Sequence, residues 1–216
     1  AMDARSRMLT LDDISDLRAY EREREAYRRA VIEIKRRRRV AVGPIVSLVF
    51  ENRETMRSQI QEMARAERMV TDEQIQKELD IYNALIPEPG ELSATLFIEL
   101  TGEHALRDWL PRLVGIEHAV VLRVPEQDPA REIGGAIEAL GEGEVVRAVP
   151  EAAHEEALTR PEITASVHYI RFALTPAQVE RFGAGPVTLA VDHPEYRAES
   201  VLSDEVRAEL LTDLRP

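Results

Sequence analysis

The chain combines stretches that have a helical repeat of apolar residues with short, nearly continuous apolar runs. In the first part, apolar positions recur at helical spacing and predict helices over residues 11–37, 52–69 and 72–86. Each helix follows a residue that can cap its first turn, namely Thr10, Asn52 and Thr71. Between the first two helices, the β-branched run Ile45–Phe50 predicts a strand, which Gly43-Pro44 separates from the residues before it.

A different pattern follows the helix breaker at residues 87–90, which reads PEPG. Short apolar runs predict strands over residues 92–100, 119–124, 165–173 and 186–191. Further helices are predicted over 103–114, after Thr175-Pro176, and from Ser203 to Leu214, whereas 125–160 predicts no particular element. The expected fold class is α+β: a helical N-terminal half with one strand, followed by a mixed or antiparallel sheet with short helices. Residues 1–86 and 87–216 then form either two parts or one continuous domain.

Composition narrows the function classes. The chain has 216 residues, of which 44% are hydrophobic and 31% charged, so a folded core is expected. It contains no cysteine, which excludes disulfides, thiolate catalysis and Cys-ligated zinc or iron–sulfur clusters within the chain. No apolar run approaches the roughly 20 residues that cross a bilayer. The start, AMDARSRMLTLDD, lacks the apolar segment of an export signal, so we expect a cytoplasmic protein.

The net charge of −12 is unevenly distributed. Residues 1–86 carry 17 basic and 16 acidic side chains, and residues 87–216 carry 11 and 24. The acidic second part argues against nucleic acid as a partner. The basic run Arg36–Arg39 closes the first predicted helix, where cations favour the negative end of the helix dipole. An exposed helix end is the simplest interpretation, and contact with phosphate or an acidic protein is the alternative.

The helix predicted over 52–69 is dense in charged and amide side chains outside its apolar face. Glu54 with Arg57, and Glu62 with Arg65, have the spacing of intrahelical ion pairs, which is typical of a solvated helix. The alternative is a binding surface for a protein partner. The residues assigned to that surface are Arg53, Arg57, Gln59 and Glu62.

The histidines suggest a second kind of site. His168 lies in the predicted strand 165–173, and His193 follows the strand 186–191. If those strands pair, His168 and His193 approach each other together with Asp192 and Glu195, and can bind iron or zinc. A hydrogen-bonded histidine in the sheet and a turn at 192–194 explain the same residues. No nucleophile elbow, P-loop or dinucleotide fingerprint occurs, which favours a non-enzymatic role, and no cofactor is expected unless a divalent metal binds here.

Several stretches together resemble a known family. They are MLTLDDI (8–14), RRVAVGPIVSLVFENRETMRSQIQEMARAER (38–68), ELDIYNALIPEPGELSATLFIEL (78–100), SVHYIRF (166–172) and VDHPEY (191–196). The chain is similar over nearly its whole length to the bacterial family called domain of unknown function 3501 (DUF3501). The resemblance implies a genomic context beside a rubrerythrin-like di-iron protein and a cysteine-rich iron–sulfur oxidoreductase.

The expected function is therefore an accessory or interaction protein of a redox or oxidative-stress module, with a rubrerythrin-like or iron–sulfur protein as its partner. The alternative is a small metal-binding protein or enzyme centred on His168 and His193. A homodimer is also expected as an alternative, because the N-terminal helices offer more apolar surface than one small sheet covers.

Overall fold

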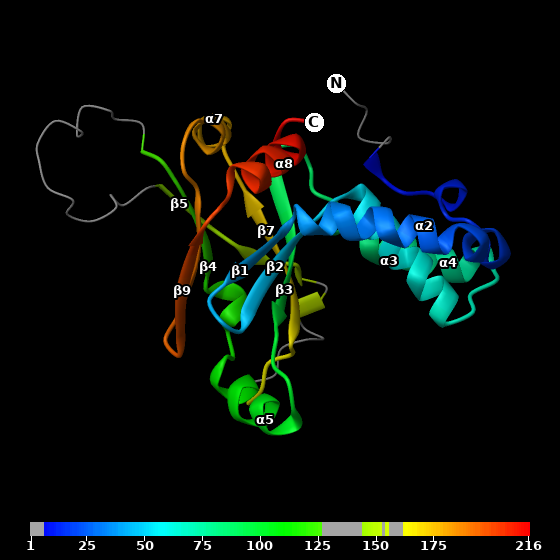
Figure 1. The fold of residues 1–216 in the computed structure, drawn as a ribbon, viewed down its shortest axis with the longest axis horizontal. Coiled ribbons are helices and arrows are strands. Elements are labelled where there is room, and N and C mark those ends of the chain that lie inside the picture. The colour runs from blue at the N-terminus through cyan, green and yellow to red at the C-terminus, as the bar shows by residue number, and fades with distance from the viewer. Residues whose placement is uncertain (1–6, 127–143, 153, 156–161) are drawn as a thin grey trace, which may run out of the picture.

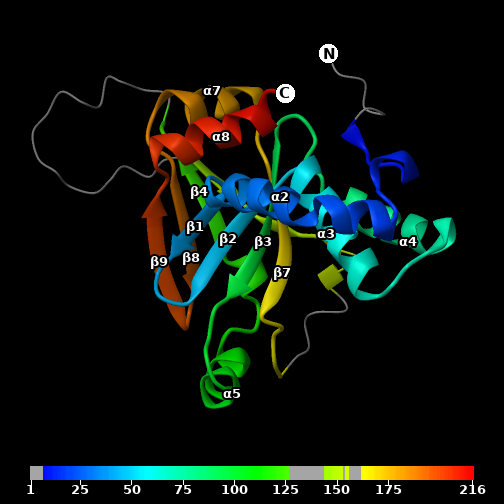
Figure 2. The same cartoon turned by 45° about the vertical axis from the view of Figure 1, so that its right-hand side comes forward.

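The α+β fold class is confirmed by the computed structural model, which describes residues 7–126, 144–152, 154–155 and 162–216. Two antiparallel sheets face each other, and three of the helices form a lobe beside them (Figure 1). Helices α7 (Pro176–Ala184) and α8 (Asp204–Leu214) cover one end of the sheets, and α5 (Glu103–Arg112) lies at the other (Figure 2). Most of the stretch 125–160, where the sequence predicts no element, lies outside the described residues.

The helical lobe contains α2 (Leu17–Arg36), α3 (Arg53–Ala66) and α4 (Asp72–Asn83). Asn52 and Thr71 cap α3 and α4 as predicted. The single helix predicted over 11–37 is wrong in its first turns, because Thr10 caps only a short 3-10 turn, η1 (Leu11–Asp13), and Asp16 caps α2. The Gln61 side chain explains the break. It hydrogen-bonds both backbone groups of Ser15, at 3.1 and 2.8 Å, in place of helical partners.

The first sheet has the strand order β1-β2-β3-β7-β6. Its strands are β1 (Arg39–Val42), β2 (Val46–Glu51), β3 (Glu91–Ile98), β7 (Val167–Ala173) and β6 (Val149–Pro150). The N-terminal half therefore has two strands rather than the one predicted. The strand β1 was hidden because only Val40 and Val42 of its four residues point inward, next to a run of arginines. Because β2 pairs with β3, residues on both sides of position 86 share one sheet.

The second sheet has the order β5-β4-β8-β9, with β5 (Glu144–Arg147), β4 (Val120–Val124), β8 (Thr188–His193) and β9 (Tyr196–Val201). The predicted pairing of the strands at 165–173 and 186–191 is wrong, because β7 and β8 belong to different sheets. The strand β8 instead forms a hairpin with β9, which the sequence did not predict, and β7 pairs with β3. Both sheets are antiparallel at every described pairing.

The main hydrophobic core lies between the sheets and under α7 and α8, and includes the fully buried Phe50, Phe172 and Phe182. A smaller core, which includes Ile60 and Leu79, joins α3 and α4. The run Arg36–Arg39 is exposed only in part: Arg36 and Arg39 are exposed, as predicted, whereas the Arg38 side chain is buried. These arginines pair with acidic residues of the chain itself: Glu205, Glu209 and Asp213 of α8, and Glu99. Within the described ranges, no helix combines the length and the apolar character that a membrane span requires.

Candidate metal centre

The charged residues of α3 that the sequence assigns to a partner surface contact their own chain. Arg53 pairs with Asp13 at 2.7 Å, and Arg57 pairs with Glu54 at 2.9 Å while lying 4.7 Å from the ring centre of Tyr27.

Glu62 accepts two hydrogen bonds of 2.9 Å from Arg24 and a further one from the Tyr20 hydroxyl. Hydrogen bonding from Arg24 holds the pKa of the Glu62 carboxyl below its usual range. Gln59 lies beside Tyr82 of α4. The four residues therefore fasten α3 to η1, α2 and α4. Of these contacts the sequence predicted only the intrahelical pair of Glu54 and Arg57.

The structure does not bring His168 and His193 together on paired strands. The Nε2 atom of His193 lies 2.8 Å from the Val114 carbonyl, and its Nδ1 accepts the Glu195 amide at 3.1 Å. Both ring nitrogens are then occupied, which leaves no lone pair for a metal. Asp192 pairs with the exposed Arg197 at 3.0 Å.

His168 is buried in the sheet, as in the alternative interpretation of the sequence. Its Nε2 atom lies 2.7 Å from the Thr164 hydroxyl and 2.9 Å from the Ala165 carbonyl. Burial lowers the pKa of its imidazole, and the nearby carboxylates of Glu117 and Glu155 oppose this effect. His168 thus interacts with a group of acidic side chains.

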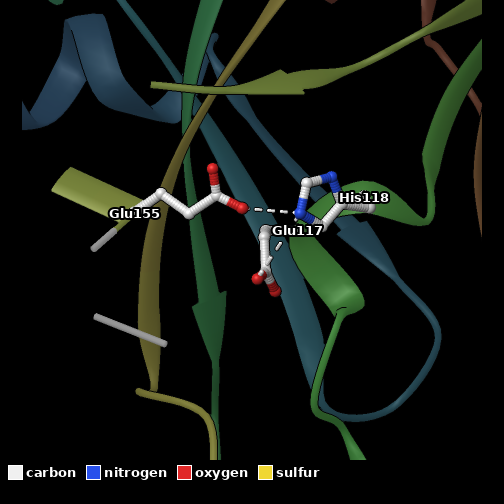
Figure 3. Close-up of side chains that lie close together, drawn as sticks. All are labelled: Glu117, His118 and Glu155. Carbon is white, nitrogen blue, oxygen red and sulfur yellow. Dashed lines mark hydrogen bonds and ion pairs between the residues drawn. The ribbon is translucent and has the colours of Figure 1, made fainter. Parts of the chain in front are cut away.

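That group is the candidate site. Glu117, His118 and Glu155 each offer one ligand atom, and these atoms all lie within 4.8 Å of one another. Figure 3 shows the carboxylates of Glu117 and Glu155 facing the same ring nitrogen of His118, Nε2. His118 Nε2 lies 2.6 Å from Glu155 Oε1 and 3.9 Å from Glu117 Oε1. Within the part of the chain that the structure describes, no other set of three such residues meets this spacing.

The backbone explains how these residues meet. Gly115, whose φ of 87° is in the left-handed region, turns the chain from α5 into the short 3-10 helix η2 (Ile116–His118). That turn buries Glu117 and leaves His118 at the surface, with side-chain exposures of 2% and 57%. Glu155 comes from one helical turn after β6, in which its amide donates to the Glu151 carbonyl at 3.0 Å. The site is therefore buried at Glu117 and open to solvent at His118.

More groups of the same chemistry surround the centre. His154 Nδ1 lies 2.6 Å from Glu151 Oε2, and the His154 ring packs edge-on against Tyr169 with centroids 4.7 Å apart.

The centre of Glu117, His118 and Glu155 was not predicted from the sequence. The signals were the adjacent Glu117-His118 and the Glu-x-x-His-Glu spacing of residues 151–155, in a stretch for which no element was predicted.

Two comparisons find proteins that are similar to this chain, and a third finds none. A family model described as "Protein of unknown function (DUF3501)" matches residues 8–214. A crystal structure of a novel protein of unknown function from Burkholderia pseudomallei K96243 is 36% identical in sequence and superimposes with a TM-score of 0.80. That match covers 96% of this chain and 99% of the other. No curated protein matches the chain.

Proposed function

The chain belongs to the DUF3501 family, and from that premise we propose that it binds a divalent transition-metal ion through Glu117, His118 and Glu155. The observation that carries the proposal is the convergence of two carboxylates and one imidazole within 4.8 Å. Imidazole suits zinc and iron, and carboxylate suits manganese, so the mixed set favours Mn²⁺, Fe²⁺ or Zn²⁺. Three protein ligands leave at least one coordination position open for water or a further ligand.

The distances between the ligand atoms are compatible with one ion. Two ligand atoms at about 2.1 Å from a tetrahedral ion lie about 3.4 Å apart. The two separations from His118 Nε2, 2.6 Å to Glu155 and 3.9 Å to Glu117, bracket that value. Small side-chain rotations at the exposed His118 and the half-buried Glu155 are enough to reach it. The ion then replaces the proton that His118 and Glu155 share.

We place this metal protein in the redox module that the family resemblance implies. A chain without cysteine cannot hold an iron–sulfur cluster by thiolates, so the cluster of the module belongs to a partner protein. We propose that this chain has an accessory role beside that partner. A carboxylate and imidazole site is chemically close to the iron sites of rubrerythrin-like proteins. We propose that the chain acts in the cytoplasm beside such a partner.

Isothermal titration of the chelator-treated protein with Mn²⁺ or Zn²⁺ tests the metal site. We expect one ion per chain, tighter binding of Zn²⁺ than of Mn²⁺, and no comparable binding of Mg²⁺. His118→Ala should weaken binding about tenfold or more, as loss of a ligand does. His104→Ala removes another exposed histidine and serves as the matched control. Equal binding by both variants, or no binding by the wild type, would refute the proposal.

Binding of a protein partner is the second candidate function, and the surface of α2 favours it. Within the described residues, no carboxylate lies within the 4 Å ion-pair distance of the exposed Arg18, Arg22 or Arg28. Ile32 of the same helix is 59% exposed. Figures 1 and 2 both show α2 on the outside of the helical lobe. The helix also carries exposed glutamates, but Arg18, Arg22 and Arg28 beside an exposed apolar residue suit a partner with an acidic surface.

Binding of the purified rubrerythrin-like and iron–sulfur proteins at low and high salt tests this second function. Arg22→Glu should weaken binding at low salt, and the difference should shrink as salt screens the charges. Lys77 is an exposed residue of α4 that pairs with Glu73, and Lys77→Glu should have little effect on partner binding. Equal effects of the two substitutions would contradict the assignment to α2. Light scattering on the same samples tests the homodimer, which stays a prediction.

A further inference from the structure

A cavity of about 610 Å³ opens where β5, β6 and β7 meet the start of α7. Its lining includes Val145, Arg147, Val149, Pro150, Glu151 and Arg171. Pockets for small molecules commonly have volumes of about 300–1,000 Å³ and an apolar lining with a few polar groups. This cavity has such a volume, and its lining combines apolar with polar and charged side chains.

Two of the lining residues connect the cavity to the metal centre. Glu151 lies one helical turn before Glu155, whose amide donates to the Glu151 carbonyl. The Arg147 guanidinium donates to the backbone carbonyl of His118 at 3.5 Å. A molecule bound in the cavity therefore lies beside the proposed ion.

The charges of the lining identify the cation that is available to a ligand. Arg171 pairs with Glu91 and also donates to the Ala84 carbonyl. Arg147 is exposed, and among the described residues no carboxylate lies within ion-pair distance of it. A guanidinium with unused N–H donors beside a cavity is the usual recognition group for a carboxylate or a phosphate.

The apolar part of the lining favours an anion that carries an organic body over an inorganic one. Val145 is 48% exposed and Val149 65% exposed, and Pro150 lies next to them in the lining. Inorganic phosphate has no apolar surface to cover these side chains, whereas an organic carboxylate has one.

We infer that the cavity binds a small organic anion, a carboxylate or a phosphate ester, with its anionic group on Arg147 and its apolar body against Val145 and Val149. The approach of this ligand to an ion rests on the proposed metal function. The binding of the ligand itself requires only the cavity and Arg147, so the two can be tested apart.

The test uses fluorine NMR with 4-fluorobenzoate as the probe and the neutral 4-fluorobenzamide as its matched partner, on the chelator-treated full chain. We expect the benzoate to bind and the benzamide to bind about tenfold more weakly or not at all. Arg147→Met keeps most of the aliphatic stem and should weaken benzoate binding by a similar factor. Arg107→Met, which removes an exposed arginine of α5 outside the cavity, should not.

The inference is overturned if wild type does not bind the benzoate, if the benzamide binds equally well, or if Arg147→Met binds as wild type does. Repeating the titration with Glu117→Gln separates the two proposals. Benzoate binding that survives this substitution supports the cavity independently of the metal, whereas its loss in the metal-free protein would contradict the assignment to Arg147.

Discussion

Replacing Arg38 by alanine should destabilise the fold far more than the same replacement of a neighbouring arginine does. The side chain of Arg38 is 1% exposed, and its two terminal nitrogens donate to the Asp213 carboxylate at 2.7 and 2.8 Å. Its Nε donates to Glu209 at 3.1 Å, and Nη1 lies 3.4 Å from the Phe50 carbonyl. This residue therefore ties α8 to β2.

The expected loss of unfolding free energy follows from the buried carboxylate that the substitution leaves without a cation. Asp213 is only 7% exposed, so its carboxylate stays buried without its cation. Removing one partner of a buried ion pair costs about 3–5 kcal/mol. The comparison is Arg37→Ala, whose side chain is 35% exposed and lies 3.6 Å from Glu209. A pair that water screens in this way contributes about 0–1 kcal/mol.

Urea unfolding followed by circular dichroism measures both free energies of unfolding. The double variant Arg38→Met/Asp213→Leu removes the buried charge together with its partner, and should recover part of the loss because apolar replacement of a buried pair is often neutral. The reasoning is refuted if Arg38→Ala costs no more than Arg37→Ala, or if the double variant is less stable than Arg38→Ala.

Three further substitutions test other parts of the fold. Ile60→Ala should cost about 2–5 kcal/mol, because Ile60 is fully buried in the smaller core; unchanged thermal stability would contradict the helix-face assignment. Gly43→Ala should lower the melting temperature more than Gly102→Ala, since both glycines have positive φ but only a Cβ at Gly43 meets Ala198 and Tyr196; equal losses would contradict this. The pKa of Glu62 is lowered in the folded state, so its contribution is present above the unfolded-state pKa and is lost as pH falls through the folded one. Glu62→Gln should therefore flatten the acid side of the stability profile, and an unchanged profile would argue against it.

Local signals predicted the helices well because helix ends are decided by residues close in sequence. Asn52, Thr71 and Thr175 each cap the expected helix, with the side chain accepting the amide hydrogen bond three residues on. The exception shows the limit. Thr10 has the same signature, but Gln61, which is distant in sequence, binds the backbone of Ser15 and ends the turn.

Strand partners and the metal centre depended on contacts that no local pattern encodes. Contacts across the whole sheet decide that β7 pairs with β3 and not with β8, so the strand pairing on which the grouping of His168 with His193 rested was predicted wrongly. No sequence pattern assigned a role to Glu117 or His118. Only the turn at Gly115 buries Glu117 and directs it toward Glu155, 38 residues later in the sequence.

Anomalous diffraction from crystals grown with Mn²⁺ tests the metal proposal most directly. We expect a peak within about 2.0–2.3 Å of His118 Nε2 and of one carboxylate oxygen each of Glu117 and Glu155. The same crystals of His118→Ala should show a weaker peak or none. A wild-type map without a peak at these three side chains, with His118 still hydrogen-bonded to Glu155, would contradict the metal centre.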